Sequence, residues 1–460
     1  MAKSTIFASL VLPLWLAACA TTPPVSTLRV PERFTQTAPA AAPDSTQVRW
    51  WGVFEDPQLD ALAAATLEHN RDLRMAVERL EQARALERAT LSTLLPAGDA
   101  TASAVRARVP GVNSLDGQPR VEQRVGAAIN ASWEIDLFGR LRAASRASEF
   151  AASASASDIA ALRAVLLAEV SSAYFAWQGV QAQMAALDEI VAGQRTQLEL
   201  AQTRHQWGAT DELDIQRARS ELRNSQAKLS ALEGESALLS SRISVLSGRF
   251  PGELEIAALD VTEIGDARPV SIGSPNFILS QRPDVGAAEA RFKAAVARSE
   301  AAWADLLPRL NVGGSLGVLA GRSSDLSGDT ARLWSVHPAL AVPLLDLLRL
   351  VPLRDARDAE TRMALAAYEG SVLSAVADVE ASAALYRTSV QRVHLLAGRR
   401  DDAVRALDLA EARYAAGAID QLALIDAQRT RRSAAIDLAA AIADHRIVVV
   451  QLYRAVGATI

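Results

Sequence analysis

The sequence contains little cysteine, few aromatic residues and no strong excess of charge. Cys19 is the only cysteine among 460 residues, which excludes an internal disulfide framework and a zinc site built from cysteines. Aromatic residues make up only 5% of the chain, so alanine-rich, closely packed helices are expected instead of a bulky globular core. The formal net charge of −5 gives no electrostatic reason to bind a nucleic-acid backbone.

Long apolar runs are missing as well. After Cys19 no run of eighteen apolar residues occurs, so a membrane crossing by the mature chain would not use transmembrane helices. Residues 6–18 form a shorter apolar run that follows Lys3 and ends in small residues before Cys19. We predict a signal peptide over residues 1–18, a covalent lipid on Cys19 at a lipobox-like sequence, and an acylated tether over residues 19–49. The alternative is an ordinary signal peptide that contains a cysteine by chance.

Proline is absent from two long windows. All 18 prolines lie at or before Pro119, or between Pro251 and Pro352. We therefore predict uninterrupted helices over residues 141–207 and 354–416. The first would extend roughly 100 Å at ~1.5 Å per residue. Helices of this length favour a coiled coil or a helical barrel.

Each predicted long helix is followed by a turn signal. Gly208 and Gly417 stand where a helix C-terminus prefers glycine, and Asp211 and Asp420 stand where a return helix prefers an N-cap. These positions predict two helical hairpins.

The two halves of the chain resemble each other. Residues 200–213 align with residues 409–422 without a gap, and Gly248 aligns with Gly457 at the same offset. Collinear matches of this kind indicate an internal duplication with a period far longer than a solenoid repeat. The predicted division is a first repeat at 50–250, a linker at 251–280 and a second repeat at 281–460.

Four segments alternate apolar and polar residues, at 100–109, 125–137, 310–318 and 334–344. This period is typical of transmembrane β-strands, and Trp133 and Trp334 suit an interfacial aromatic girdle. Pro338 and Pro343 weaken the last strand. The alternative is a small soluble sheet with one buried face. Four strands cannot close a barrel in lipid, so membrane insertion would require oligomerisation, and three chains would contribute twelve strands.

Several motifs, in order, resemble those of TolC-like outer membrane factors, and within them the NodT-type efflux lipoproteins. They are WWGVFEDPQL at 50–59, SWEIDLFGR at 132–140, QRPDV at 281–285 followed by AAEA at 287–290, and Arg413-Tyr414, Gly417, Leu422 and Asp426-Ala427-Gln428. The resemblance covers essentially the whole mature chain.

The resemblance implies a trimeric 12-stranded β-barrel in the outer membrane, continuous with a long periplasmic α-helical barrel. It also implies passive conduction of exported substrates, with no enzymatic activity and no cofactor beyond the lipid on Cys19. The expected partners are two further copies of the chain, a periplasmic adaptor protein and an inner-membrane pump. The turns at Gly208 and Gly417 would lie at the periplasmic tip, where adaptors dock in the family.

Some family features are absent. The second strand-to-helix junction is often FDGGR in the family, whereas residues 345–349 read LDLLR. Tyr414 and Asp426 match positions of the family's periplasmic gate, but Ala423 and Ile419 replace other gate residues. We predict an acidic constriction from Asp426, with Asp214 as a second candidate. It would favour cations. The alternative is that both aspartates are surface residues paired to arginines.

Competing functions have weaker support. Residues 313–317 read GGSLG and satisfy the G-x-S-x-G pattern, but a nucleophile elbow requires a strand-to-helix turn at the serine. The five histidines are scattered without the spacing of metal ligands. A coiled-coil scaffold or adaptor lipoprotein would explain the helices, but neither the strand segments nor the motifs.

Overall fold

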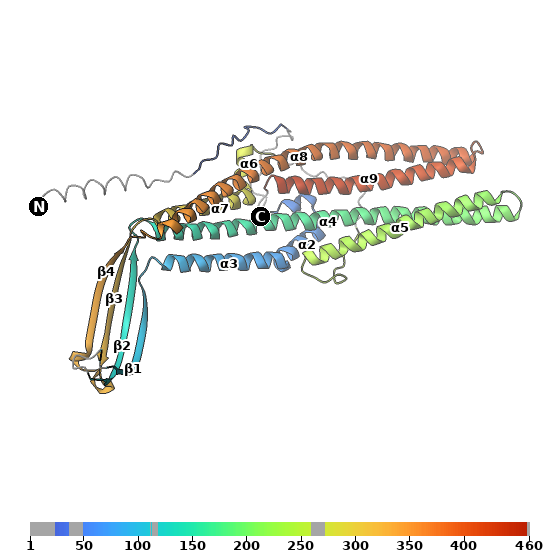
Figure 1. Ribbon diagram of the computed structural model, residues 1–460. Coiled ribbons are helices and arrows are strands. Elements are labelled where there is room, and N and C mark those ends of the chain that lie inside the picture. The colour runs from blue at the N-terminus through green and yellow to red at the C-terminus, as the bar shows by residue number, and fades with distance from the viewer. Residues whose placement is uncertain (1–23, 36–48, 111, 113–117, 259–271, 458–460) are drawn as a thin grey trace. The chain divides into compact units, whose positions relative to one another are not determined.

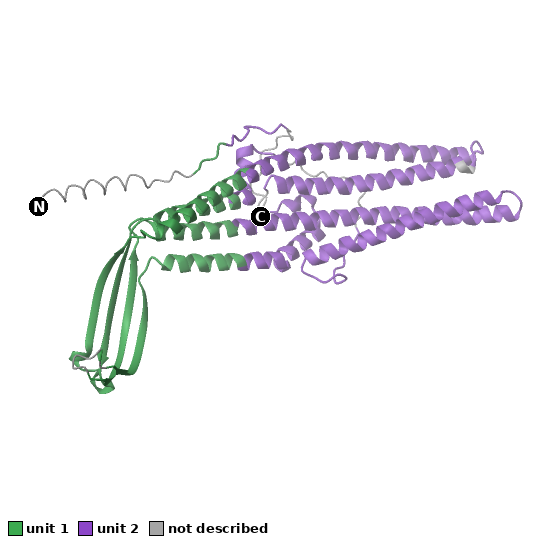
Figure 2. Ribbon diagram, in the orientation of Figure 1, with its two compact units in different colours: residues 1–27, 79–156, 287–369 green, residues 28–78, 157–286, 370–460 purple. Residues whose placement is uncertain are grey.

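The computed structural model describes residues 24–35, 49–110, 112, 118–258 and 272–457. The predicted signal peptide and Cys19 therefore lie outside the described residues. The chain separates into two compact units (Figure 2). Unit 1 contains residues 1–27, 79–156 and 287–369, and unit 2 contains residues 28–78, 157–286 and 370–460.

The described residues are mostly helical, with antiparallel strands (Figure 1). In chain order the elements are η1 (Trp50–Phe54), α2 (Pro57–His69), α3 (Arg71–Ser92), β1 (Ala97–Val109), β2 (Arg120–Ile135), α4 (Arg140–Gln206), α5 (Glu212–Leu246), α6 (Pro275–Gln281), α7 (Pro283–Ala304), β3 (Arg309–Ala320), η3 (Ser323–Asp325), η4 (Asp329–Ala331), β4 (Arg332–Ala341), α8 (Leu347–Ala415) and α9 (Gln421–Ala455).

Unit 1 contains one antiparallel sheet with the order β1-β2-β3-β4, seen side by side in Figure 1. The four predicted strands are confirmed, with ends shifted by a few residues. The pairing of β2 with β3 joins the two predicted strand pairs, and its register runs without a bulge from Val125 opposite Ala320 to Ile135 opposite Leu310. Pro338 lies in β4, which is an edge strand of the sheet within one chain, the place in a sheet where proline is usually found.

Unit 2 contains two helical hairpins, in which α4 runs beside α5 and α8 runs beside α9 (Figure 1). The first pair is joined by a hydrogen bond from Gln181 to Ser236 of 2.7 Å. The second pair encloses an apolar cluster that includes Val393, Leu438 and Ile442. The two long predicted helices are confirmed as α4 and α8.

The predicted start of the second long helix is wrong. Helix α8 begins at Leu347 and contains Pro352, whereas the prediction began after this proline. Proline removes one helical N–H bond but does not prevent the helical φ angle. The first turn is held by N–H groups of Arg349 and Leu350, which both donate to the carbonyl of Asp346 at 2.9 Å.

The core of unit 2 includes an aromatic cluster made by the WWGVF segment and two long helices. Trp50 is 2% exposed and stacks on Tyr453 with ring centroids 5.6 Å apart. Phe54 contacts Phe175 at 4.6 Å between centroids. The Tyr174 hydroxyl donates to Asp56 at 2.7 Å, while Asp56 also accepts from backbone N–H groups at the start of α2. The segment preceding α2 is thus fixed to α4 and α9.

Among the described residues, α4 alone contains an 18-residue window long and apolar enough to cross a membrane. Half of that window is buried within the chain. Burial of this kind is what a core helix requires, because its apolar side chains face other helices.

Candidate functional site

The sheet of unit 1 has one apolar face that crosses all four strands. Side chains of directly paired residues lie on the same face of a sheet, and residues two apart along a strand share it. One such row consists of Ala100, Ile129, Leu316 and Trp334. The next row towards the helices contains Ala131 and Val336 beside two glycines, and the row after it contains Trp133, Val312 and Pro338.

This apolar face is exposed. The exposed fractions are 63% for Ile129, 66% for Leu316 and 76% for Trp334. A soluble sheet would cover such side chains with its core, so the alternative of a small soluble sheet does not fit. Trp133 is 40% exposed and its indole N–H donates to the carbonyl of Leu94 at 3.0 Å. An apolar ring with a satisfied polar edge suits a membrane interface.

The opposite face carries small and polar side chains. Asn130 donates to Asp99 at 3.1 Å, and Ser315 and Ser335 are hydrogen-bonded at 2.9 Å. Ser315 therefore lies in the middle of β3, not at a strand-to-helix turn, so the G-x-S-x-G pattern does not form a nucleophile elbow. The alternation of an apolar and a polar face is the pattern expected of membrane β-strands.

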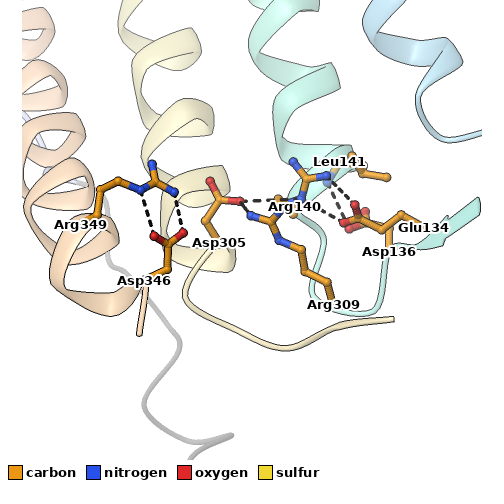
Figure 3. A network of polar contacts seen from close by, with 8 residues as sticks. All are labelled: Glu134, Asp136, Arg140, Leu141, Asp305, Arg309, Asp346 and Arg349. Carbon is orange, nitrogen blue, oxygen red and sulfur yellow. Dashed lines mark hydrogen bonds and ion pairs between the residues drawn. The ribbon is translucent and has the colours of Figure 1, made fainter. Parts of the chain in front are cut away.

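A network of charged side chains holds the ends of the strands to the helices that follow (Figure 3). Arg140 donates both arms of its guanidinium to Glu134, at 3.0 and 2.8 Å. It also lies 3.8 Å from Asp305, which pairs with Arg309 at 2.6 Å. The network links β2, α4 and the segment joining α7 to β3.

Asp136 caps the start of α4. Its carboxylate accepts from the backbone N–H groups of Leu141 and Arg142 at 3.1 and 3.0 Å. Burial opposes its ionisation, but these hydrogen bonds and the Arg142 guanidinium outweigh it and hold the pKa of Asp136 below its usual value. Gly139, with φ of 78°, makes the turn into the helix.

The second junction has a turn of different sequence, over residues 342–346, where the first junction uses residues 136–139. The sequence LDLLR has no glycine at this point, and Asp346 instead binds Arg349 through two hydrogen bonds of 3.1 and 2.6 Å. Both junctions nevertheless share a tight turn, since Leu137 N–H donates to Ile135 and Leu344 N–H donates to Val342. The departure from the family sequence removes the glycine and leaves the connection from strand to helix in place.

The two hairpins end in the same way. Gly208 and Gly417 both have φ of 69°, and both N–H groups donate to a carbonyl three residues earlier at 2.9 Å. Asp211 and Asp420 cap α5 and α9 by accepting from the N–H three residues later. The predicted turns and caps are confirmed.

The three predicted gate residues are exposed near these turns. Tyr414 lies in the last turn of α8, Asp426 in the second turn of α9 and Asp214 in the first turn of α5. The Asp214 carboxylate accepts from the Thr210 hydroxyl. Within the part of the chain that the structure describes, no hydrogen bond or ion pair joins the three side chains, and neither aspartate pairs with an arginine.

Sequence reasoning missed a pair of equivalent contacts at the bases of the hairpins. Asn70, at the start of α3, donates to the carbonyl of Leu246 at 3.0 Å. Arg282, at the start of α7, donates to the carbonyl of Ala455 at 3.0 Å. In both cases the residue directly before an α-helix donates a hydrogen bond to the carbonyl of the last residue of a return helix. The sequence contains a signal for this equivalence. Leu95-Pro96 aligns with Leu307-Pro308 at an offset of 307 − 95 = 212 residues, and this offset also places Asn70 on Arg282.

We call Asn70 and Arg282 the two clamps, and of the two only Arg282 carries a charge. It also binds Asp284 at 2.7 Å and Asp378 at 3.1 Å, and its side chain is only 9% exposed. Burial opposes ionisation of Asp284, but Arg282 outweighs it and holds the pKa of this carboxyl below its usual value.

Metal binding has no structural support among the described residues, where no group of three or more His, Cys, Asp or Glu is placed to hold an ion. His445 is 6% exposed, and its Nδ1 lies 2.8 Å from the Ser389 hydroxyl. The Nδ1 of His205 lies 2.9 Å from the carbonyl of Thr210. These two histidines have packing or turn contacts.

Comparisons with known proteins agree with this geometry. Residues 62–249 and 275–458 match the outer membrane efflux protein family. The toluene efflux pump outer membrane protein TtgF of Pseudomonas putida is 30% identical over 384 residues, covering 83% of this chain and 79% of the relative. The outer membrane protein OprJ of Pseudomonas aeruginosa is 29% identical over 466 residues, covering 98% and 95%.

Solved structures show the same fold. The outer-membrane channel OprN is 31% identical, with a TM-score of 0.79, and the match covers 94% of this chain and 99% of that one. The MtrE outer membrane channel of Neisseria gonorrhoeae, at 24% identity and a TM-score of 0.81, supports the fold alone.

A sheet with an exposed apolar face, joined to paired long helices, defines a protein of the outer membrane channel class. This chain belongs to the outer membrane efflux protein family. It is therefore an outer membrane channel protein that extends into the periplasm, and it is not an enzyme. The scaffold alternative is thereby excluded.

Proposed function

We propose that this chain is the channel subunit of a tripartite efflux or secretion system, and that it conducts substrates passively across the periplasm and outer membrane. The observation that carries the proposal is the apolar, exposed face of the four-stranded sheet, in a chain whose relatives are efflux channels. Such a face is stable only against lipid or a partner.

Closure of the barrel requires further copies of the chain. The sheet leaves β1 and β4 as edge strands, and unpaired backbone groups are not tolerated in lipid. An even strand number of at least about eight is usual for bacterial barrels. We infer a homotrimer with a twelve-stranded barrel, in which β1 of one copy pairs with β4 of the next.

The two repeats would each supply one strand pair and one helical hairpin to this assembly. The equivalent clamps by Asn70 and Arg282, together with the equivalent turns at Gly208 and Gly417, support the division into repeats at 50–250 and 281–460. A duplicated chain in a trimer gives six hairpins of similar structure around one axis.

The driving force would come from outside the channel. Relatives of nearly equal identity are named as toluene and as antibiotic efflux pump proteins, which supports delivery of the substrate by a pump and not selection by the channel. We infer an inner-membrane pump and a periplasmic adaptor as partners, with the adaptor docking at the turns of Gly208 and Gly417. We also infer acylation of Cys19, which would add a lipid anchor to the inserted barrel.

The periplasmic end would be narrowed by acidic side chains. Asp426 is exposed at the end of one hairpin and Asp214 at the end of the other, and Tyr414 lies beside the same turn as Asp426 in sequence. Three copies would place several carboxylates around the opening, which supports a constriction that favours cations.

Single-channel recording tests the proposal. The purified, acylated full chain should produce discrete conducting steps in planar bilayers, and light scattering in detergent should give the mass of a trimer. A folded oligomer that conducts no ions would refute the channel function. A folded monomer would refute the closed barrel.

A further inference from the structure

The apolar face of the sheet changes character at one end. In β1 this face is formed by even-numbered residues, because Ala100 is paired with Ile129 in the apolar row. The same face continues through Ala102 and Ala104 to Arg106 and Arg108. Arg106 and Arg108 therefore occupy the last two positions of β1 on this face, and both charges lie at the edge of its apolar segment.

A third arginine lies on the same face in the other edge strand. Arg332 is paired with Val318, which is itself paired with Ala127 of the apolar face. Its neighbour on that face is Trp334, an aromatic ring of the kind found at membrane interfaces. We call Arg106, Arg108 and Arg332 the basic rim.

Arg106 and Arg108 lie at the end of the sheet away from the helices, and Arg332, at the start of β4, is level with Ala102 of β1. The opposite end is joined to α4 by the network of Arg140 and Glu134 (Figure 3). In the proposed function the helices extend into the periplasm, so insertion of the sheet would place Arg106 and Arg108 towards the extracellular end of the strands.

The rim arginines are available to a ligand. All three are exposed, and among the described residues Arg106 and Arg108 form no ion pair. Arg332 pairs with Asp329 at 3.2 Å, but both side chains are largely exposed, at 72% and 87%. An exposed pair of this kind is weak and can exchange for a stronger anion.

On the opposite face at the same level, the charges are already balanced. Glu122 binds Arg120 at 2.7 Å and Arg124 at 2.8 Å. An arginine paired within the sheet gains less from binding an external anion, whereas Arg106 and Arg108 form no ion pair among the described residues.

We propose that the basic rim binds the phosphate groups of the phosphorylated glycolipid in the outer leaflet of the outer membrane. This rests on the proposed function only through insertion of the sheet into the membrane. Arginine guanidinium groups bind phosphate in two-pronged geometry, and their aliphatic stems lie favourably against acyl chains just below. The apolar rows beneath the rim would contact the acyl chains of the same glycolipid. Arg106 and Arg108, with the apolar positions Ala102 and Ala104 beneath them on the same strand, thus fit one amphipathic molecule with an anionic head.

Lipid retention measured by native mass spectrometry tests this. The full-length oligomer in neutral detergent is titrated with diphosphorylated lipid A, and Arg106→Gln/Arg108→Gln is compared with the wild type. Each arginine near an anionic surface contributes about 1 kcal/mol, so the double variant should bind about thirtyfold more weakly and each single variant about fivefold. Added salt should weaken wild-type binding more than binding by the double variant.

Arg124→Gln is the matched control, because it removes one arginine at the same level on the opposite face and leaves Glu122 paired with Arg120. It should bind lipid A as the wild type does. Equal binding by the double variant, equal loss in Arg124→Gln, or equal binding of the dephosphorylated glycolipid would each overturn the proposal. Conductance of the double variant in phosphatidylcholine bilayers tests channel function separately, and should be unchanged.

Discussion

At the scale of single residues, stability in unit 2 depends on buried polar groups with specific partners. Tyr174 is fully buried and its hydroxyl reaches Asp56, while His445 is nearly buried and reaches Ser389. Neither partner is a neighbour in sequence. The sequence identifies Trp50 and Asp56 as motif residues, but their contacts depend on tertiary packing and could not be predicted from local patterns.

Replacing Tyr174 with phenylalanine should destabilise the protein by about 2 kcal/mol, as expected for a buried hydrogen bond to a charged group. Burial and the nearby Asp56 carboxylate both raise the pKa of Tyr174, so the hydroxyl stays protonated and donates throughout the physiological range. Urea unfolding, monitored by far-ultraviolet circular dichroism, measures the decrease in the free energy of unfolding. Tyr414→Phe, at an exposed position, should leave the midpoint unchanged; equal midpoints for both variants would contradict the argument.

His445 predicts a dependence of stability on pH. Burial first, and the positive charge of Arg446 second, lower its pKa below the usual 6.5. The unfolded chain therefore takes up a proton at a higher pH than the folded chain. The contribution of neutral His445 to the free energy of unfolding is fully present above pH 6.5. It is lost as the pH falls from 6.5 towards the lower pKa of the folded state.

The measurement is the unfolding midpoint between pH 7.5 and pH 5 for the wild type and His445→Gln. The variant should lose less stability on acidification than the wild type, whose Tyr386 ring and Ser389 hydroxyl surround the imidazole. His394→Gln, at an exposed position of the same hairpin, is the control and should keep the wild-type pH dependence. If the unfolding midpoint changes equally with pH in all three proteins, His445 is not the source of the pH dependence.

At the scale of elements, the sequence predicted much of the fold because its signals are local. Proline-free windows located α4 and α8, period-two alternation located the four strands, and Gly208 with Gly417 located the hairpin turns. The start of α8 was missed because Pro352 was treated as a helix boundary. Pairing of β2 with β3 joins residues far apart in sequence, so no local pattern could reveal it. The clamps by Asn70 and Arg282 also join distant residues, and only the comparison of the two repeats points to their equivalence.

Substitution by alanine should change the stability of the protein differently at two glycines that share one backbone conformation. Gly208 and Gly248 have φ of 69° and 74°, so each alanine carries the strain of a left-handed residue, about 1 kcal/mol. A Cβ at Gly208 meets nothing within 4 Å, whereas at Gly248 it would lie 2.5 Å from the carbonyl oxygen of His69. Overpacking adds about 1–3 kcal/mol there.

We therefore expect Gly208→Ala to lower stability slightly and Gly248→Ala to lower it by about 3 kcal/mol. Thermal unfolding of the two variants in the same detergent makes the comparison. Because the aligned Gly457 has φ of 73° and would meet Arg282 at 2.9 Å, Gly457→Ala should resemble Gly248→Ala. A smaller effect at Gly248 than at Gly208 would show that the hairpin base is less tightly packed than the structure indicates.

At the scale of the whole molecule, the described chain is incomplete as a membrane protein. Its sheet has an apolar face without a cover and two edge strands without partners, and the proposed insertion into lipid as an oligomer would meet both needs. Oligomer number and partner identity are not encoded in any local pattern, so they follow only from the requirement for closure and from the family. The proposed gate would likewise form only after assembly, because it needs carboxylates from several copies of the chain.

The acidic constriction gives a prediction that only the assembled channel can show. Asp426→Asn removes one carboxylate from every copy at once, so the effect on ion selectivity is multiplied around the axis, while the stability of a single chain barely changes at an exposed site. The ratio of cation to anion permeability, measured from reversal potentials in a salt gradient, should fall in this variant and fall further when Asp214→Asn is added. Asp408→Asn, an exposed aspartate of α8 outside the predicted constriction, should leave the ratio unchanged. If all three variants keep the wild-type ratio while conducting normally, the narrowest part of the channel is lined by other residues, and the channel function stands without an acidic gate. A fall in Asp408→Asn alone would instead place the selective charge further along α8.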